Sequence, residues 1–344
     1  MDYQRVAEPG EGLRLHLNEN TAGCSPKVLE AIRAIGATQI SFYPDYAPAL
    51  AACADLFGVA LSRLALVNGL DEGIWATASA CIRAGDAVGE AIVPEPTFDM
   101  YGACVRAVGG RVTAIPPGPG FRFPIEEVQA AIGPATRVVY LCSPNNPTGL
   151  SIAREHVSAI ARTLPRGALV FLDEAYVDFG SRSFLPLLDT HDNVVVGRTF
   201  AKAYGLAALR IGCLIAQPAA LSVVQRAIPP YSLNACAIEG VRAAIADREY
   251  HDWYCAQVTE SRELIYENCA RFGLTCWRSD ANFVLVHAGD RSAALVQALA
   301  ARGVFIRDRT GEPGCTGCVR ITAGVVEHTR ICLAAMEEVL CAEE

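Results

Sequence analysis

Lysine is almost absent from this sequence. Of the 29 basic residues in the 344-residue chain, only Lys27 and Lys202 are lysines. Any chemistry that needs a primary amine on a side chain therefore has only two candidate positions. Ser25 and Pro26 are typical of a helix N-cap and of the first helical residue, so we expect Lys27 to lie in the first turn of a solvent-exposed helix. This leaves Lys202 as the better candidate for chemistry.

Long apolar runs and an excess of positive charge are also missing. No run approaches the roughly 18 residues that cross a bilayer, and the first residues lack the apolar stretch of a signal peptide. The formal net charge of −8 provides no basic surface for nucleic acid. With 52% hydrophobic and 19% charged residues, we expect a globular, cytoplasmic protein that binds neither membranes nor nucleic acid.

Signatures of nucleotide and metal binding are absent as well. No Gly-x-Gly-x-x-Gly follows the first expected strand and no Gly-Lys-Ser/Thr phosphate loop occurs, which argues against a nicotinamide-dependent oxidoreductase. The 14 cysteines are scattered through apolar segments, as expected of reduced core residues. Cys315 and Cys318 have redox or metal spacing, but no second pair or nearby histidine completes a site. We predict no metal.

The sequence does contain an alternation of amphipathic helices and short β-rich segments between about residues 38 and 225. This alternation predicts an α/β architecture, with a mainly parallel central sheet and crossover helices on both faces. The expected strands are residues 64–67, 88–93, 111–115, 137–142, 168–173, 193–199 and 209–216. The expected helices between them are residues 72–84, 97–108, 124–132 and 152–163. Ligands of such sheets bind beyond the carboxyl ends of the strands.

The pattern changes after about residue 230, where long helices are expected at 234–247 and 251–271. A strand at 282–286, a helix at 291–301 and strands near 304–307 and 318–322 follow. We interpret this part as a smaller α+β domain. The predicted organisation is an N-terminal arm that joins the small domain (1–37), a large domain (38–228) and a small C-terminal domain (229–344).

Several of the expected strands end in reactive or hydrogen-bonding side chains. The strand at 137–142 leads into Ser143-Pro-Asn-Asn-Pro-Thr-Gly149, a turn in which the prolines and the glycine fix the backbone while amides project. The next strand ends in Asp173-Glu-Ala-Tyr176, and the one after it is followed by Lys202 and Arg210. An amide, a carboxylate, a phenol, a lysine and an arginine are thus expected at one edge of the sheet. Residues 68–72 begin a helix there, and its backbone N–H groups suit an anion.

These residue types are the ones that a pyridoxal phosphate site requires. A lysine amine bonds the cofactor's aldehyde, and a carboxylate facing the ring nitrogen keeps the ring protonated and electron-withdrawing. Phenol and amide donors suit the ring's 3-oxygen, while an arginine, hydroxyls and a helix N-terminus suit the phosphate. Asp173, Tyr176 and Arg210 each have an ordinary structural explanation when taken alone. Their joint placement at successive strand ends favours a cofactor site.

These segments resemble the signatures of fold-type-I pyridoxal-phosphate enzymes, the class I/II aminotransferases, and within that class those of the histidinol-phosphate aminotransferases. The central matches are residues 143–149, 173–176 and 199–210. The other matching segments are Leu17-Asn-Glu-Asn20, Tyr43-Pro-Asp45, Gly69-Leu-Asp-Glu72, Pro96-Thr-Phe-Asp-Met-Tyr101, Ala281-Asn-Phe283 and Val319-Arg-Ile-Thr322. They cover nearly the whole chain in order. They are more specific for the class than for the substrate.

The resemblance implies a role for each matching residue around the cofactor. Lys202 would hold pyridoxal phosphate as a Schiff base and act as the general base of the 1,3-proton shift. Asp173 would pair with the ring nitrogen, and Tyr176 and Asn146 would bind the 3-oxygen. The residues implied for the phosphate are Arg210, Thr199, the backbone of Leu70 and Asp71, and Tyr43 from the other subunit of a homodimer.

The sequence departs from the family pattern at two positions near the cofactor. Phe98 stands where the family usually stacks a tyrosine on the ring, so stacking is kept while a phenol hydrogen bond is lost. Ala201 stands where a serine commonly precedes the lysine. That change removes a phosphate hydrogen bond worth roughly 1 kcal/mol or somewhat more. We expect somewhat weaker cofactor retention but not loss of function.

The resemblance also implies how the substrate is bound. Arg320 matches the arginine that fixes the acidic end of the substrate, and a planar guanidinium suits a carboxylate or a phosphate. Arg307 and Tyr3 match residues that histidinol-phosphate enzymes add for the phosphate ester, and Asn20 is expected to contact the substrate as well. The implied reaction passes an amino group from histidinol phosphate to the cofactor and then to 2-oxoglutarate, giving imidazole-acetol phosphate and glutamate.

Other functions stay open on the sequence alone. An aminotransferase for aromatic or other amino acids would share nearly every motif, and Leu70, Phe98 and Thr21-Ala-Gly-Cys24 leave room for a changed pocket. A decarboxylase of the phosphothreonine type also resembles this family. A non-catalytic binding module is disfavoured, because it would have little use for the lysine, aspartate and tyrosine set.

Overall fold

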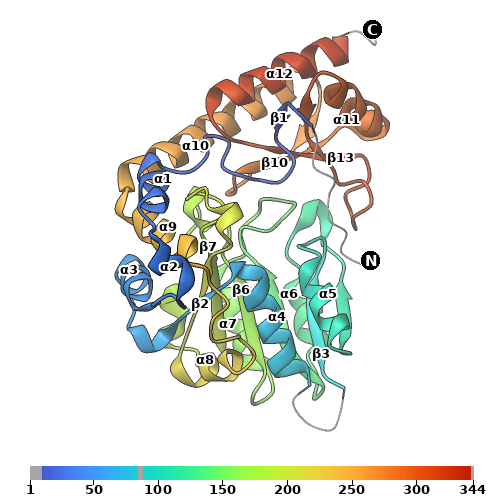
Figure 1. The fold of residues 1–344 in the computed structure, drawn as a ribbon. Coiled ribbons are helices and arrows are strands. Elements are labelled where there is room, and N and C mark those ends of the chain that lie inside the picture. The colour runs from blue at the N-terminus through green and yellow to red at the C-terminus, as the bar shows by residue number, and fades with distance from the viewer. Residues whose placement is uncertain (1–9, 84–87, 342–344) are drawn as a thin grey trace.

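The computed structural model describes residues 10–83 and 88–341. A seven-stranded sheet with the strand order β2-β8-β7-β6-β5-β3-β4 lies at the centre of the larger domain (Figure 1). Its strands are β2 (Leu64–Val67), β3 (Glu90–Pro94), β4 (Arg111–Ile115), β5 (Thr136–Cys142), β6 (Leu169–Asp173), β7 (Val194–Thr199) and β8 (Gly212–Ala216). Each strand expected between residues 64 and 216 is therefore present, and only the ends differ.

The strand β8 runs against its neighbours. It pairs antiparallel with β7 and β2, whereas β3, β4, β5, β6 and β7 pair in parallel. The sequence pattern did not distinguish β8 from the parallel strands. A parallel strand needs a crossover of a dozen or more residues, usually a helix, but residues 200–211 form only a loop with the short 3-10 turn Ala207–Leu209. As a result, β8 begins at the same sheet edge where β5, β6 and β7 end.

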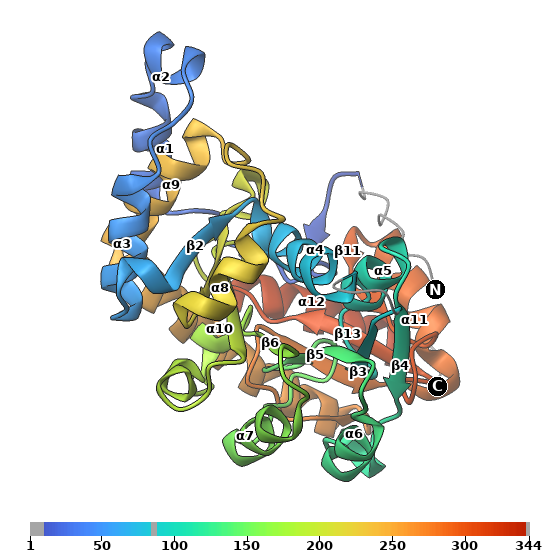
Figure 2. The same cartoon turned by 90° about the horizontal axis from the view of Figure 1, so that it is seen from below.

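Helices cover both faces of this sheet, as predicted (Figure 2). The central strands β5, β6 and β7 are almost completely buried, which explains their continuous runs of Val, Leu and Phe. The helices that pack on one face are α4 (Gly69–Ile82), α5 (Met100–Ala107) and α8 (Pro218–Gln225). The helices that pack on the other are α3 (Ala47–Phe57), α6 (Ile125–Ala131) and α7 (Arg154–Thr163).

The smaller domain lies over the edge of the sheet at which the parallel strands end (Figure 1). Its sheet has the order β12-β13-β10-β9, formed by β9 (Thr275–Cys276), β10 (Phe283–His287), β12 (Arg307–Asp308) and β13 (Cys318–Thr322). The helices α10 (Arg248–Arg271), α11 (Ser292–Ala301) and α12 (Val326–Cys341) pack in this part, whereas α9 (Ala235–Ala246) packs against α3 of the larger domain. The single strand expected near 304–307 is two strands, because β11 (Val304–Phe305) pairs with β1 whereas β12 pairs with β13.

The N-terminal segment is part of this smaller domain. The strand β1 (Leu13–Arg14) pairs in parallel with β11. The backbone N–H of Leu15 then donates to the Phe305 carbonyl (2.8 Å), and the N–H of Thr322 donates to the Leu15 carbonyl (3.0 Å). These bonds lead residues 16–20 past the edge of the large sheet. The domain limits at residues 37 and 228 stay a prediction.

The helices α1 (Pro26–Arg33) and α2 (Ala37–Ser41) form an end that projects from the body of the molecule (Figure 2). The expected cap is present, since Ser25 Oγ accepts a hydrogen bond from the Lys27 N–H at 3.1 Å. The exposed Lys27 amine pairs with Asp247 at 2.9 Å. Lys27 thus lies in the first turn of an exposed helix, as its position in the sequence predicted, and is held there by an ion pair.

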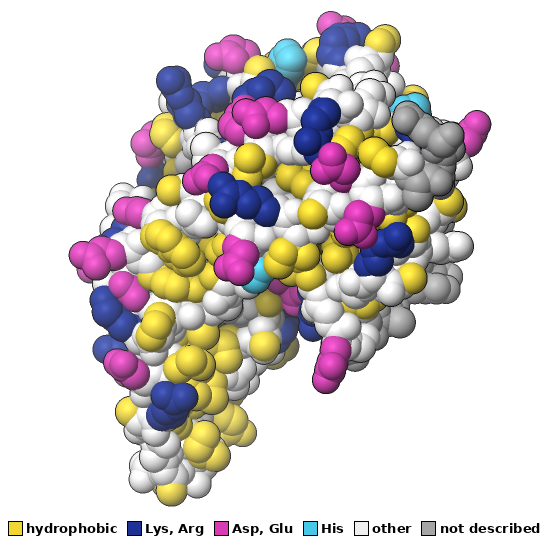
Figure 3. Space-filling model, turned by 90° about the horizontal axis from the view of Figure 1, so that it is seen from above, with side chains coloured by type: hydrophobic (Ala, Val, Ile, Leu, Met, Phe, Trp, Pro, Cys, Tyr) yellow, Lys and Arg dark blue, Asp and Glu magenta, His cyan; other side chains and the backbone are white. Residues whose placement is uncertain are grey.

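Large apolar side chains are exposed at this projecting end, where Figure 3 shows hydrophobic surface. Ile40, Phe42 and Tyr43 are 67%, 71% and 76% exposed, and Tyr43 stacks on the exposed ring of Tyr231 at 4.2 Å. Such a cluster is typical of a surface that a partner covers. In the part of the chain that the structure describes, no helix is both long and apolar enough to span a membrane.

Candidate active site

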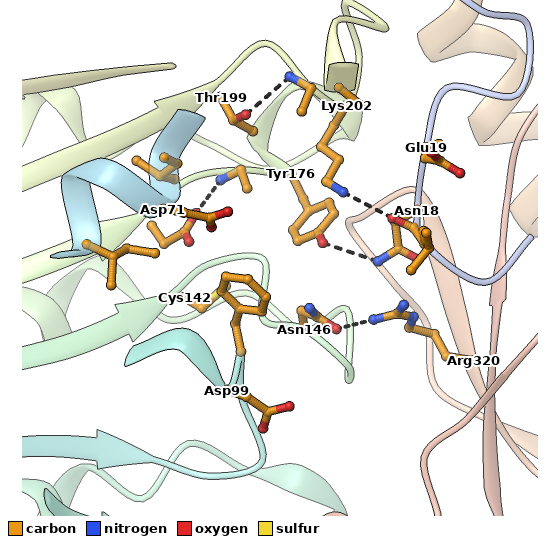
Figure 4. A pocket seen from close by; sticks show the side chains of 18 of the residues that line it. Asn18, Glu19, Asp71, Asp99, Cys142, Asn146, Tyr176, Thr199, Lys202 and Arg320 are labelled. Carbon is orange, nitrogen blue, oxygen red and sulfur yellow. Dashed lines mark hydrogen bonds between the residues drawn. The ribbon is translucent and has the colours of Figure 1, made fainter. Parts of the chain in front are cut away.

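Lys202 lies in the loop between β7 and β8 and extends toward the smaller domain (Figure 4). Its Nζ donates a hydrogen bond to the carbonyl of Leu17 at 3.1 Å and lies 5.7 Å from the ring centre of Tyr176. Burial, and then the positive charge of Arg320, lower the pKa of Lys202 from 10.5 to about 8. The neutral amine is therefore readily reached near neutral pH, as a nucleophile or general base requires.

Asp173 ends β6 and is 4% exposed. One carboxylate oxygen accepts a hydrogen bond from the Tyr101 hydroxyl (2.7 Å) and the other accepts from the Ala175 N–H (2.8 Å). Burial raises the pKa of Asp173 from 3.8 to about 6, against the opposing effect of these donors. A cation placed against this carboxylate would favour its charged form.

Tyr176 follows Asp173 closely and is 5% exposed. Its hydroxyl oxygen accepts a hydrogen bond from Asn18 Nδ2 at 3.1 Å, which leaves the phenol proton to be donated elsewhere. Asn18 is itself fixed by the smaller domain: Thr322 Oγ1 donates to its side-chain oxygen (3.2 Å) and Asn282 Nδ2 donates to its carbonyl (3.1 Å). The N-terminal segment thus sets the orientation of the phenol.

Arg320 lies in the middle of β13 and is 4% exposed. Figure 4 shows its guanidinium beside Asn146, and Nη1 donates to the Asn146 side-chain oxygen while Nη2 donates to the His16 carbonyl at 2.8 Å. Burial, and then the charge of Arg309, lower the pKa of Arg320 to about 9. Neither hydrogen-bond acceptor is charged, so this buried cation is suited to an anionic ligand.

A second anion site lies at the N-terminus of α4, directly after β2. The first N–H groups of a helix lack intrahelical acceptors and carry partial positive charge. Arg210, in the left-handed conformation (φ 54°), places its guanidinium against this helix end and bonds Asp71 at 3.1 Å. Gly69 has a positive φ of 71°, and a Cβ there would meet that guanidinium, so glycine favours the approach. Thr199 lies nearby, and its Oγ1 accepts from the Ala201 N–H (3.1 Å).

These groups surround a cavity of about 730 Å³ between the sheet edge and the smaller domain. This size suits a small cofactor together with a small substrate. The predicted site residues that line it are Leu70, Asp71, Phe98, Asn146, Asp173, Tyr176, Thr199, Lys202, Arg210, Arg307 and Arg320. In residues 10–83 and 88–341, no group of three or more His, Cys, Asp or Glu side chains is arranged to hold a metal ion.

Two predicted residues lie outside the cavity lining, and a third lies outside the described residues. Asn20 does not line the cavity, because its amide is used in the loop: Nδ2 donates to the Ala203 carbonyl (3.1 Å) and Oδ1 accepts from the Ala22 N–H (3.0 Å). The contact of Asn20 with substrate stays a prediction. Tyr43 lies on the projecting end, outside the cavity lining. Tyr3 lies outside the described residues.

Three residues with no role predicted from the sequence also belong to the site. Asn18 and Arg309 line the cavity, and Tyr101 lies behind Asp173. Signals for them existed. Asn18 belongs to the Leu17–Asn20 motif, Tyr101 lies one helical turn after Phe98, and Arg309 lies two residues after Arg307, on the same side of an extended chain.

Comparison with known proteins identifies the family. The model of the family described as "Aminotransferase class I and II" matches residues 11–338. The chain belongs to this family. The histidinol-phosphate aminotransferase of Symbiobacterium thermophilum is 32% identical to this aminotransferase, over 98% of this chain and 93% of that protein. The histidinol-phosphate aminotransferase of Halorubrum lacusprofundi is 35% identical, over 98% of this chain and 91% of that protein.

A solved structure supports the same conclusion. The histidinol-phosphate aminotransferase from Sinorhizobium meliloti, in complex with pyridoxal-5′-phosphate, superimposes with a TM-score of 0.86 at 29% identity, covering 97% of this chain and 92% of that one. The aminotransferase has fold type I and depends on pyridoxal phosphate. Its residues fit this cofactor: a buried carboxylate could face the ring nitrogen, a buried amine could bond the aldehyde, and the α4 N-terminus with Arg210 could hold the phosphate.

We expect Tyr101→Phe to weaken cofactor binding by about tenfold, because Asp173 loses a hydrogen bond that favours its charged form. The pKa of Asp173 should also rise further. As the pH is lowered, the affinity for the cofactor should therefore begin to fall at a higher pH in the variant than in the wild type. Titrating the protein with cofactor between pH 5 and about pH 8 measures both effects. Tyr140→Phe is the control, because it removes an equally buried hydroxyl that bonds only a backbone carbonyl. Matching affinities for Tyr101→Phe and wild type at every pH would contradict this role.

Proposed function

We propose that this aminotransferase transfers the amino group of histidinol phosphate to 2-oxoglutarate. The observation that carries the proposal is the pair Arg307 and Arg320, which are direct cross-strand partners on the wall of the cavity. Two arginines on the same wall of a cavity suit a substrate that ends in a strongly anionic group. The relatives named histidinol-phosphate aminotransferase, which match almost the whole chain, support the same substrate.

Bound pyridoxal phosphate supplies an electron sink for the reacting carbon of the amino donor. In our proposal Lys202 holds the cofactor by its amine and afterwards moves the proton of that carbon as a general base. Asp173 holds a proton on the ring nitrogen. The Tyr176 hydroxyl and the Asn146 amide nitrogen donate to the ring's 3-oxygen, since their other hydrogen-bonding atoms are occupied by Asn18 and Arg320.

The remaining roles concern the two faces of the ring and the phosphate. Phe98 lines the cavity and makes an edge contact with Tyr101 at 5.8 Å, so we assign it to stacking on the cofactor. The first-turn N–H groups of Leu70 and Asp71, the Arg210 guanidinium and the Thr199 hydroxyl bind the phosphate. Ala201 lines the same cavity without a hydroxyl, in keeping with the weaker retention that we predict.

Both substrates are anionic, so one arginine-lined wall serves both halves of the reaction. Histidinol phosphate would give up its amino group, with the bound cofactor as electron sink, and would leave as imidazole-acetol phosphate. The acceptor 2-oxoglutarate then takes the nitrogen and leaves as glutamate. In each half reaction Arg320 holds the acidic end of the substrate against Asn146, while Arg307 adds a second positive charge for the phosphate ester.

We further propose that the enzyme acts as a homodimer in the cytoplasm. The exposed apolar cluster at the projecting end supports an interface between copies, and Tyr43 is the residue of that cluster that we assign to the phosphate of the neighbouring site. Tyr3, which lies outside the described residues, is assigned to the substrate phosphate by the sequence resemblance alone.

A single-turnover experiment tests the substrate. Holoenzyme is mixed with histidinol phosphate, with L-histidinol or with L-phenylalanine, and conversion of the cofactor to its amine form is followed by absorbance. We expect histidinol phosphate to react fastest, with 2-oxoglutarate restoring the starting spectrum. Faster reaction with phenylalanine would replace the substrate assignment by an aromatic one, and release of carbon dioxide without any keto acceptor would indicate a decarboxylase.

A further inference from the structure

Arg309 shares a face of the smaller sheet with Arg307 and Arg320. Arg307 and Arg320 are paired residues of β12 and β13, so their side chains leave the sheet on the same side. The ladder continues past the end of β12, because the Arg309 N–H donates to the Cys318 carbonyl at 2.9 Å. Side chains two residues apart in an extended chain point to the same side. All three arginines accordingly line the same cavity.

Two of these cations are buried and incompletely bonded. Arg309 and Arg320 are 7% and 4% exposed, and the Nε atom of each is buried without a hydrogen-bond partner. Buried guanidinium N–H groups are costly when they lack an acceptor, and adjacent like charges add to that cost. The charge of Arg309 is one cause of the lowered pKa of Arg320. An anion with several oxygen atoms would satisfy both groups.

The carboxylates around this face are mostly engaged already. Glu312 pairs with Arg309, and it lines a neighbouring pocket together with Phe98 and Asp99 but does not line the main cavity. Among the acidic residues that line the main cavity, Glu19 is held by Arg14, Asp71 by Arg210, and Asp173 by Tyr101. Asp99, the residue after Phe98, also lines the cavity. Positive charge therefore dominates on the β12–β13 side.

We propose that Arg309 is a specificity-determining residue that binds the doubly charged end of the amino donor together with Arg320, and that Glu312 restrains Arg309 and limits its attraction for anions. This inference rests on the proposed function and deepens it. A single guanidinium can bind a carboxylate in a bidentate manner, whereas a phosphate ester has two charges and three free oxygens, which a second buried guanidinium can match. Arg309 thus favours a phosphate ester over a carboxylate.

Calorimetric titration of the holoenzyme with inorganic phosphate tests the inference directly, because the cofactor already fills the other phosphate site. We expect Arg309→Gln to weaken phosphate binding by about 10- to 100-fold, the range for one lost charged hydrogen-bonding group. Glu312→Gln should strengthen binding by about three- to tenfold, since it removes a competing charge but keeps an oxygen for Arg309. Arg302→Gln, which breaks an exposed ion pair with Glu338, should bind like the wild type.

The two variants, Arg309→Gln and Glu312→Gln, are expected to change phosphate binding in opposite directions. If the ion pair were merely structural, both variants would bind phosphate more weakly. If Arg309→Gln does not fold, Arg309→Lys keeps the charge without the planar fork and should show an intermediate loss. Equal phosphate affinity of wild type and either Arg309 variant would overturn the inference.

Donor kinetics then distinguish a failure of this inference from a failure of the proposed function. For histidinol phosphate, Arg309→Gln should lower the single-turnover efficiency by about 10- to 100-fold, while the reaction with unphosphorylated histidinol should change little. A wild-type enzyme that binds phosphate through Arg309 but does not convert histidinol phosphate would contradict only the substrate assignment. Conversion of histidinol phosphate with equal efficiency by wild type and Arg309→Gln would contradict only the role of Arg309.

Discussion

Replacing Lys202 with alanine is expected to lower the rate of amino transfer by at least about 10⁴-fold. The variant lacks the side chain that we expect both to attach the cofactor and to transfer a proton. Proton transfer by a positioned side chain alone accelerates such reactions by about 10²- to 10⁴-fold. The structure supports both functions, since the pKa of Lys202 is lowered to about 8 and its amine lies beside Tyr176. Stopped-flow absorbance with saturating amino donor measures the loss.

Because the chain has only two lysines, one control variant covers every other lysine that could bind the cofactor. Lys27→Ala removes the chain's other lysine, which lies on the surface in an ion pair with Asp247, and should leave the rate within about twofold. Reduction of the holoenzyme with borohydride, followed by peptide mass analysis, should place the cofactor on the peptide that contains Lys202. Cofactor on Lys27, or a Lys202→Ala enzyme that retains more than about one hundredth of the activity, would refute the assignment.

Asp173→Asn is expected to lower the rate of amino transfer by about 10²- to 10³-fold and, at the same time, to stabilise the cofactor-free protein. The rate falls because a neutral amide does not hold a proton on the ring nitrogen, and breaking such a buried charge pair costs roughly 2–5 kcal/mol. The cofactor-free protein gains stability because the substitution removes a buried charge. Without the ring, the carboxylate is a buried charge whose pKa is raised from 3.8 to about 6.

The sign of the pH dependence follows from that raised pKa. In the cofactor-free protein the folded state binds the proton more tightly than the unfolded state, so stability falls as the pH rises from about 4 through 6 and stays lower above that. Asp173→Asn removes this penalty and should raise the free energy of unfolding by roughly 1–3 kcal/mol at pH 8, after allowance for its hydrogen bonds, and by little at pH 4. Urea unfolding at both pH values measures the difference.

Asp189→Asn provides the matched control, because it makes the same chemical change at an exposed carboxylate paired with Arg63. We expect neither its activity nor its stability to change appreciably. An Asp173→Asn protein that is less stable than the wild type at pH 8 in the cofactor-free form would show that the carboxylate contributes more through its bonds to Tyr101 and Ala175 than its burial costs.

The parts of the site that the sequence predicted are those attached to the ends of buried parallel strands. Asp173 and Thr199 are the last residues of β6 and β7, and Lys202 follows three residues later. Runs of apolar residues define such strands, and the shared direction of parallel strands brings their ends to one edge. Local pattern therefore carries three-dimensional information at these positions.

Other positions depend on contacts that no local pattern encodes. Asn18 reaches the site only because β1 pairs with β11, which lies almost 300 residues later in the chain. Asn20 is also an asparagine and lies two positions after Asn18. Its side chain nevertheless bonds the Ala203 carbonyl and the backbone of its own loop. The reversed direction of β8 depends on a loop without an α-helix, and the role that we propose for Arg309 depends on a ladder that continues past β12.

The route of the N-terminal segment links the position of one domain to the ionisation of a side chain in the other. The strand β1 pairs with β11 of the smaller domain, and a few residues later the Leu17 carbonyl accepts the hydrogen bond of the Lys202 amine. A carbonyl acceptor stabilises the ammonium form more than the neutral amine. Burial beneath the smaller domain and the charge of Arg320 outweigh this effect and lower the pKa of Lys202, so the position of the smaller domain over the sheet keeps the amine easy to deprotonate.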